Sequence, residues 1–245
     1  MTPQQSLSSK VKALVEAVFS ATDSQRGEVL YQLVYFVKEH EGEDIFEPLE
    51  SALPKLVDYL LVDTDNLDGC TISICRRVHI NDKTIKRLLE LQKMEANALV
   101  IEALGLVERA SWNTELQSAL RIGLSHKKTV FAASYALARA FQKLSKDTIV
   151  SLGSTALAQE LLSAYQAIMA LVYQLDYENQ TIAYTWLEKV VRGADERRKG
   201  ELAHILGWGC KNHEKASALL TLLKDDTALS VQKAVQDALV RRNQE

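Results

Sequence analysis

The chain has 245 residues, a formal charge of −3 at pH 7 and a hydrophobic share of 47%, which are ordinary values for a soluble globular protein. This balance excludes a global electrostatic attraction to nucleic acid but allows local basic patches, and no apolar run approaches the length that spans a bilayer. The three cysteines cannot all pair within the chain, and the N-terminus lacks the pattern of a signal peptide, so we expect a cytoplasmic protein.

Proline is confined to the start of the chain, where Pro3, Pro48 and Pro54 all lie before residue 55. The remaining residues are dense in Ala, Leu, Gln, Glu and Lys, which favour helices. The composition therefore predicts an all-α protein.

The first eighty residues predict three helices, which coincide with the segments "SSKVKALVEAVF", "RGEVLYQLVYFVKEH" and "PKLVDYLLVD". Pro54 suits the first turn of the third helix, because the N–H that it lacks is not needed there. The segment "DTDNLDG" indicates a loop, and "TISICRRVHI" fits either a short strand or a degenerate second helix of a hairpin. We interpret residues 1–80 as divergent N-terminal helical repeats that cap an array, since terminal repeats are commonly atypical.

From residue 81 to residue 245 the sequence repeats itself. Similar apolar segments centre on Leu104, Leu137, Leu171, Leu206 and Leu239, which are 33, 34, 35 and 33 residues apart. A second apolar stretch precedes each of them, in the order "TIKRLLELQ", "LQSALRIGL", "STALAQELL", "AYTWLEKVV" and "KASALLTLL". Each unit is thus predicted as helix A, a short turn and helix B, with about five such units. One unit cannot bury its apolar stripe alone, so the units must stack.

Residues at the expected helix ends support this division. Asn81 precedes the first helix A and Asn113 precedes the second, and asparagine is a favoured N-cap residue. Gly193 and Gly209 follow predicted helices, where glycine commonly supplies a left-handed residue.

Two of the segments carry a resemblance to known repeats. "LLKDDTALSVQKAVQDAL", from Leu222 to Leu239, and "IEALGLVERA" resemble the HEAT and armadillo-type families, in which a turn with Asp joins helix A to a helix B of the kind V-x-x-A-x-x-A-L-G. The resemblance implies an α-solenoid of about five to seven stacked helical hairpins, with residues 81–245 as HEAT-like repeats of about 34 residues. The period also suits tetratricopeptide repeats, but their Trp-Leu-Gly-Tyr, Ala-Phe and terminal Pro positions do not recur.

Helical spacing predicts which side of a helix B is buried. In the second unit Val130, Ala133, Leu137, Ala140 and Leu144 form the apolar face. Residues two positions before and after an anchor leucine are rotated by about 200° from it and should face outward. We define the B-helix ladder as the outward residues that we expect to bind a partner, namely Tyr135, Arg139, Met169, Tyr173, His204, Trp208 and Arg241.

The B-helix ladder is rich in the residue types that dominate interfaces, since tyrosine, tryptophan and arginine combine a large rigid area with a polar group. If the array curves as HEAT arrays do, the ladder lines its concave surface. The alternative is that Tyr173 or Trp208 packs under the next repeat.

Phosphate binding is a second hypothesis. Lys127 with Lys128, and Arg197 with Arg198 and Lys199, fall in two predicted inter-helix turns, where contacts to phosphates would give salt-sensitive binding of nucleic acid. Lysines and arginines in turns are more often simply solvated, and neighbouring glutamates dilute the second cluster.

Metal binding and catalysis find less support. Cys70, Cys75 and His79, with Cys210 and His213 far along the chain, do not have the spacing of a standard zinc site, so we expect free thiols and no metal or other cofactor. No nucleophile elbow, zinc-protease, phosphate-loop or dinucleotide motif occurs.

Some HEAT-like proteins are DNA glycosylases, and Trp208 with Asp237 imitates their aromatic and carboxylate pair, but no local motif of that family accompanies the pair. The sequence therefore predicts a non-enzymatic scaffold or adaptor that binds a protein or peptide, with nucleic-acid binding as the alternative.

Overall fold

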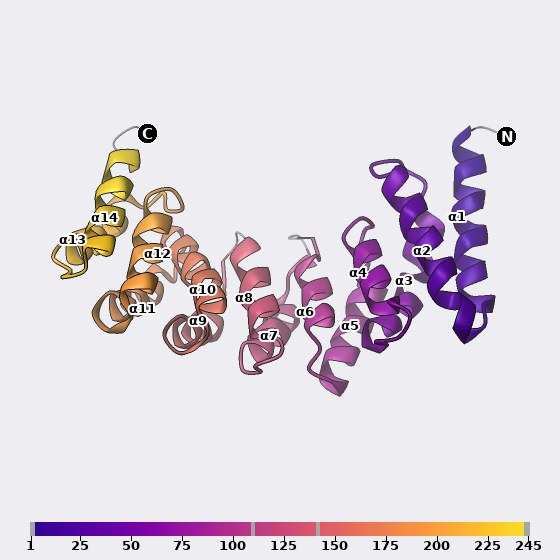
Figure 1. The fold of residues 1–245 in the computed structure, drawn as a ribbon, viewed down its shortest axis with the longest axis horizontal. Coiled ribbons are helices and arrows are strands. Elements are labelled where there is room, and N and C mark those ends of the chain that lie inside the picture. The colour runs from indigo at the N-terminus through magenta and orange to yellow at the C-terminus, as the bar shows by residue number, and fades with distance from the viewer. Residues whose placement is uncertain (1–2, 109–110, 141–142, 243–245) are drawn as a thin grey trace. The chain divides into compact units, whose positions relative to one another are not determined.

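The computed structural model describes residues 3–108, 111–140 and 143–242, in which fourteen α-helices and no strand occur (Figure 1). The chain divides into two compact units, Met1–Trp112 and Asn113–Glu245. The predicted boundary at residue 80 separates irregular from regular repeats, whereas this division separates compact units. The predicted boundary therefore stays a prediction. None of the described helices is both long enough and apolar enough to cross a membrane.

The first unit consists of helices in two layers. Contacts join α1, α3 and α5 in one layer and α2, α4 and α6 in the other, so that successive helices alternate between layers. A 3-10 helix, Val57–Leu61, continues α3. The helices are α1 (Pro3–Ser20), α2 (Asp23–Glu39), α3 (Glu47–Leu56), α4 (Leu67–Cys75), α5 (Asp82–Met94) and α6 (Ala98–Gly105).

Three details of the first unit differ from expectation. The predicted loop "DTDNLDG" is shorter than expected, because α4 begins at Leu67. The segment "TISICRRVHI" contains most of helix α4 and no strand, so of the two readings only the degenerate helix is correct. Pro54 lies inside α3, whereas Pro48 occupies the first turn. The prediction for Pro54 was wrong because the helix begins at Glu47, before the apolar segment from which its start was inferred.

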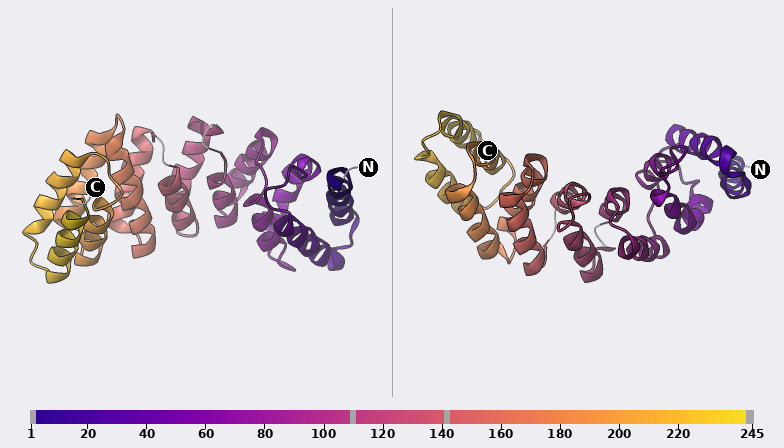
Figure 2. Two further views of the ribbon diagram at one scale, coloured as in Figure 1. Left: turned by 90° about the horizontal axis from the view of Figure 1, so that it is seen from above. Right: turned by 60° about the horizontal axis from the view of Figure 1, so that its bottom comes forward.

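The second unit has the same alternation in four hairpins. Its A helices are in contact in the order α7, α9, α11, α13, and its B helices in the order α8, α10, α12, α14. Figures 1 and 2 show the B helices side by side along one flank of this unit. The helices are α7 (Thr114–Gly123), α8 (Val130–Arg139), α9 (Lys146–Ala158), α10 (Leu161–Tyr173), α11 (Gln180–Gly193), α12 (Glu196–Leu206), α13 (His213–Lys224) and α14 (Leu229–Arg242).

Together with α5 and α6, these helices confirm five predicted hairpins and the α-solenoid architecture. One boundary was wrong, because "STALAQELL" is not a single helix: α9 ends at Ala158 and α10 begins at Leu161. The break falls at Gln159, whose extended backbone stops α9.

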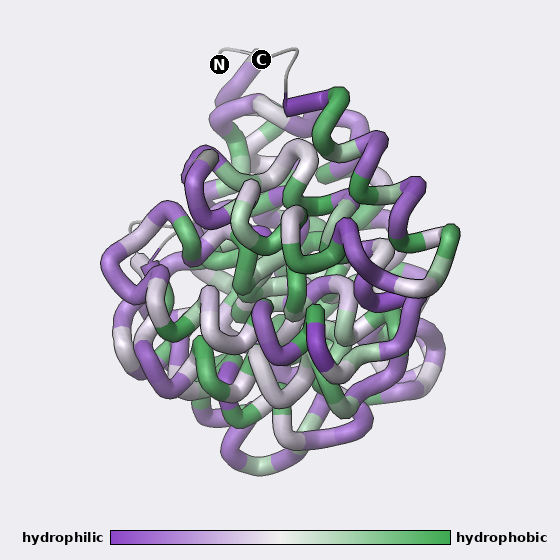
Figure 3. The backbone as a smooth tube through the Cα atoms, turned by 90° about the vertical axis from the view of Figure 1, so that its left-hand side faces the viewer, coloured by the Kyte–Doolittle hydropathy of each residue, from purple (hydrophilic) through white to green (hydrophobic). Residues whose placement is uncertain are grey.

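The predicted core positions are mostly correct. Polar and apolar positions alternate along the individual helices, as helical amphipathicity requires (Figure 3). All five residues of the predicted apolar face around Leu137 are buried, as are the anchors Leu104, Leu171 and Leu206. Leu239 is the exception, with 37% exposure, because α14 has another B helix of this chain on one flank only.

Asparagines at helix starts also connect successive hairpins. Asn81 and Asn113 cap α5 and α7 as predicted, by accepting from the backbone N–H groups of Thr84 and Leu116. Asn212 caps α13 and in addition donates through Nδ2 to the backbone oxygen of Leu175, 3.2 Å away, in the 3-10 helix Gln174–Asp176 between α10 and α11. The same type of link is repeated from Asn81 to Glu50, from Asn97 to Leu60 and from Asn179 to Leu144.

The glycines act through close packing more than through turn conformation. Neither Gly193 nor Gly209 is left-handed, since the one described glycine with positive φ is Gly42, at 90°. By contrast, a Cβ at Gly153 would lie 2.1 Å from the ring of Trp186, and one at Gly207 would lie 2.9 Å from Cα of Ala238. These two glycines allow α9 to approach α11 and α12 to approach α14.

Candidate partner-binding surface

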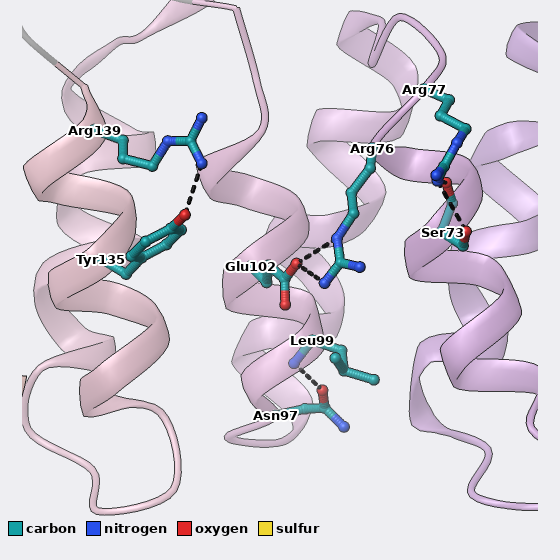
Figure 4. Close-up of polar contacts among 8 residues, drawn as sticks. All are labelled: Ser73, Arg76, Arg77, Asn97, Leu99, Glu102, Tyr135 and Arg139. Carbon is teal, nitrogen blue, oxygen red and sulfur yellow. Dashed lines mark hydrogen bonds and ion pairs between the residues drawn. The ribbon is translucent and has the colours of Figure 1, made fainter. Parts of the chain in front are cut away.

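Helix α8 presents an aromatic pair and an arginine to solvent. Tyr135 is 37% exposed and Phe131, one turn earlier, is 47% exposed. Their rings stack with centroids 6.1 Å apart. Arg139, one turn later, donates from Nη1 to the Tyr135 hydroxyl at 2.7 Å, and its guanidinium lies 5.4 Å from the tyrosine ring centroid (Figure 4). The spacing of four residues stacks these side chains along one stripe of the helix.

Helix α10 contributes side chains that are less exposed. Met169 and Tyr173 are half-buried, and so is Tyr165, one turn before Met169. Burial raises the pKa of the Tyr173 phenol above its ordinary value, and burial together with Glu201 on α12 raises that of Tyr165. A Cβ on Gly209 would contact the Tyr173 ring at 3.7 Å, so this ring leans against the end of α12. Tyr173 is therefore partly packed against the next repeat, as the alternative interpretation expected.

Helices α12 and α14 meet at a third cluster. Trp208 is 43% exposed and its ring lies edge-on to that of His204, with centroids 6.4 Å apart. Arg241 on α14 places Nη1 3.5 Å from Nδ1 of His204, so the imidazole lies between the indole and the guanidinium. At 43% exposure, much of Trp208 remains open to solvent.

The structure thus brings the B-helix ladder onto four adjacent helices, with five members exposed and Met169 and Tyr173 half-buried. The sequence reasoning missed Phe131 and Tyr165, each one turn N-terminal to a ladder residue. Extending the outward stripe by four residues from Tyr135 and Met169 would have found them.

A depression of about 490 Å³ adjoins the ladder at His204, and its other lining residues are Glu196, Arg197, Gly200, Glu201 and Ser230.

The predicted phosphate contacts are placed differently. Lys127 and Lys128, the α7–α8 turn lysines, are exposed in a turn as expected. Arg197, Arg198 and Lys199 were expected in a turn but form the first turn of α12, because Asp195 already caps this helix.

Two of these three α12 cations are bonded within the chain. Arg198 donates to Asp195 and to the backbone oxygen of Gln159. Lys199 places Nζ 2.7 Å from Oδ2 of Asp226, and this ion pair is largely buried, with 17% and 13% of the two side chains exposed. These intramolecular bonds leave less charge for a phosphate.

The cysteines are buried free thiols. Burial raises the pKa of Cys75 to about 12 and that of Cys210 to about 11, which keeps both protonated at neutral pH. Within the described ranges, no three His, Cys, Asp or Glu side chains gather to hold a metal ion. His79 bonds Glu108, and the side chain of His213 lies outside the part that the structure describes.

Comparisons with known proteins identify the fold. No family model matches the chain, and no curated protein matches it. Among solved structures, an engineered protein aligns with a TM-score of 0.54 and 18% identity, over 95% of this chain and 68% of that one.

Two designed armadillo repeat proteins align less well. One, solved in complex with the peptide (KR)4, has a TM-score of 0.43 and 18% identity over 94% of this chain and 98% of its own. The other, computationally designed for modular peptide recognition, has a TM-score of 0.36 and 20% identity over 94% and 99%. At these identities the likeness concerns the fold alone, which is an α-solenoid of stacked helical hairpins.

Proposed function

We propose that this α-solenoid is a non-catalytic scaffold that binds a protein or peptide along the B helices of its second unit. The observation that supports the proposal is the exposure of aromatic side chains on α8 and just after α12, the two B helices that flank α10. Phe131, Tyr135 and Trp208 are between 37% and 47% exposed. Clustered exposed apolar area of this kind commonly marks an interaction site, and Trp, Tyr and Arg supply most interface hot spots.

The arrangement suits binding better than chemistry. Arg139 and His204 are held by neighbouring side chains, so part of the rotamer entropy is lost before a partner arrives. Trp208 in the turn after α12 and Asp237 on α14, the pair considered for glycosylase-like chemistry, are both exposed. Replacement of Asp237 by Asn tests that alternative, since it should abolish any glycosylase activity and leave peptide binding intact.

A selection of displayed random peptides tests the proposal. We expect peptides selected on the wild-type protein to lose binding to a Tyr135→Ala/Trp208→Ala variant by at least about tenfold, because each removes an aromatic anchor. The matched control is Leu222→Ala, which removes a side chain of 40% exposure from the A helix α13. Circular dichroism should show unchanged helicity in both variants. Selected peptides that bind the aromatic variant as well as wild type would refute the proposal.

A further inference from the structure

Resting on this proposed function, we infer that the partner segment is extended and acidic at both ends, with carboxylates that bind Arg139 and Arg241. The two arginines lie at the carboxyl-terminal ends of α8 and α14, which are the outer B helices of the second unit. Between them, at the same ends of α10 and α12, lie Tyr173 and Trp208. We call this row of four side chains the carboxyl-end edge.

The two arginines lack an acidic partner within the described residues. Arg139 bonds the neutral hydroxyl of Tyr135, and Arg241 bonds the ring of His204. An exposed guanidinium with a neutral partner retains its full charge for a bidentate carboxylate. Lys211, which is exposed in the loop after α12, adds a further positive charge near the same edge.

Of the two acidic residues in the loops at this edge, one forms an ion pair and the other is bonded only by neutral groups. Asp176 accepts the backbone N–H groups of Asn212 at 2.8 Å and Lys211 at 3.2 Å. Glu178 pairs with Lys143, which lowers the pKa of the carboxyl group below its ordinary value. Asp176 keeps its negative charge, because its partners are neutral N–H groups. The three cations Arg139, Arg241 and Lys211 outnumber it, so the net charge at the carboxyl-end edge is positive.

Two other carboxylates limit where the acidic ends can lie. Glu201 precedes His204 by about one helical turn on α12, and Asp237 precedes Arg241 by about one turn on α14. A partner carboxylate displaced by one turn toward the helix starts would meet these like charges. The partner segment therefore binds along the carboxyl-end edge, with its apolar side chains against Tyr173 and Trp208.

The spacing of the acidic ends follows from helix packing. Three helix-to-helix steps separate α8 from α14, and neighbouring axes lie roughly 9 Å apart, so the arginines are separated by roughly 27 Å. An extended chain covers about 3.3 Å per residue, so the two acidic residues should be about eight positions apart.

The experiment compares three selections from one library of random displayed peptides, each about twelve residues long so that they can span both arginines. On the wild-type protein we expect enrichment of Asp or Glu at two positions about eight residues apart. On the Arg139→Glu/Arg241→Glu variant we expect Lys or Arg at these positions, and about tenfold weaker binding of the acidic peptides. The control Lys224→Glu changes a cation at the end of α13, in the other layer, and should select the same acidic peptides as wild type.

The outcomes separate this inference from the proposed function. Peptides that depend on Trp208 but are basic or uncharged would overturn the acidic partner and leave the binding surface in place. Peptides that ignore both Trp208 and the two arginines would overturn both. Acidic peptides whose enrichment is unchanged by the charge reversal would also overturn the inference, because their charge would then be recognised elsewhere.

Discussion

The contact between Gly153 on α9 and Trp186 on α11 allows a stability prediction of defined size. A Cβ at position 153 would lie 2.1 Å from Cδ2, 2.4 Å from Cγ and 2.5 Å from Cε3 of the indole. Carbon atoms prefer separations of about 3.5–4.0 Å, so the ring must move if Gly153 is replaced by Ala. Because α9 and α11 are neighbours in the A layer, this movement disturbs the stacking of two hairpins.

Two opposing contributions set the size of the change in unfolding free energy. Alanine is about 1 kcal/mol better than glycine inside a helix, whereas overpacking a well-filled contact costs about 1–3 kcal/mol. Since three ring atoms lie closer than any real Cβ contact allows, the upper part of the second range applies. We expect Gly153→Ala to lower the free energy of unfolding by about 1–2 kcal/mol.

Equilibrium urea unfolding, followed by circular dichroism, measures this change. Gly200→Ala is the matched control, because Gly200 also lies inside a helix but has no atom within 4 Å of an added Cβ, so its replacement should stabilise. In a Trp186→Ala background Gly153→Ala should likewise stabilise, by about 1 kcal/mol. The packing argument is refuted if Gly153→Ala stabilises the wild-type protein as much as Gly200→Ala does.

The remaining predictions concern links between hairpins and surface charge. Asn212→Ala should lower the unfolding free energy by about 2 kcal/mol, because it removes a cap and leaves the Leu175 carbonyl unbonded, while Asn212→Asp keeps the cap and should lose less. The bond from Lys199 lowers the pKa of Asp226, so the native state favours the ionised carboxyl. The stability advantage of wild type over Asp226→Asn should be full above about pH 5 and shrink as the pH falls below about 4, toward the lowered pKa of the native state, which urea titrations across pH would show. Duplex DNA and RNA titrated across salt concentrations should show no steep salt dependence, and any that appears should vanish when the α7–α8 turn lysines are replaced by glutamine.

The hairpins could be predicted because their burial pattern is local. Each unit must bury the same apolar stripe against the same kind of neighbour, so buried leucines recur at a regular spacing. They are Leu104, Leu137, Leu171 and Leu206. The start of α10 was missed for the opposite reason. Ala and Leu lie on both sides of Gln159, so neither hydrophobicity nor helix propensity marks the break.

The state of individual site residues depends on contacts that the sequence does not encode locally. Exposure of Tyr135 follows from its angular position on α8, and this was predictable. Two of the contacts join residues more than twenty positions apart: the Tyr173 ring packs near Gly209, and Lys199 bonds Asp226. Such pairs depend on how closely two hairpins approach, which helical periodicity alone does not determine.

Leu206 and Leu239 show why stability and binding can be separated in this fold. They are 33 residues apart and occupy the same helical phase, yet Leu206 is fully buried and Leu239 is 37% exposed. The difference arises because α12 has B helices on both flanks, α10 and α14, whereas α14 contacts only α12 among the B helices. A B helix inside the array therefore uses its flanks and its inner face for packing, and only its outer stripe is left unconstrained. Trp208 is exposed in the turn that directly follows α12, so its replacement should cost the fold little while it removes a central contact for a partner.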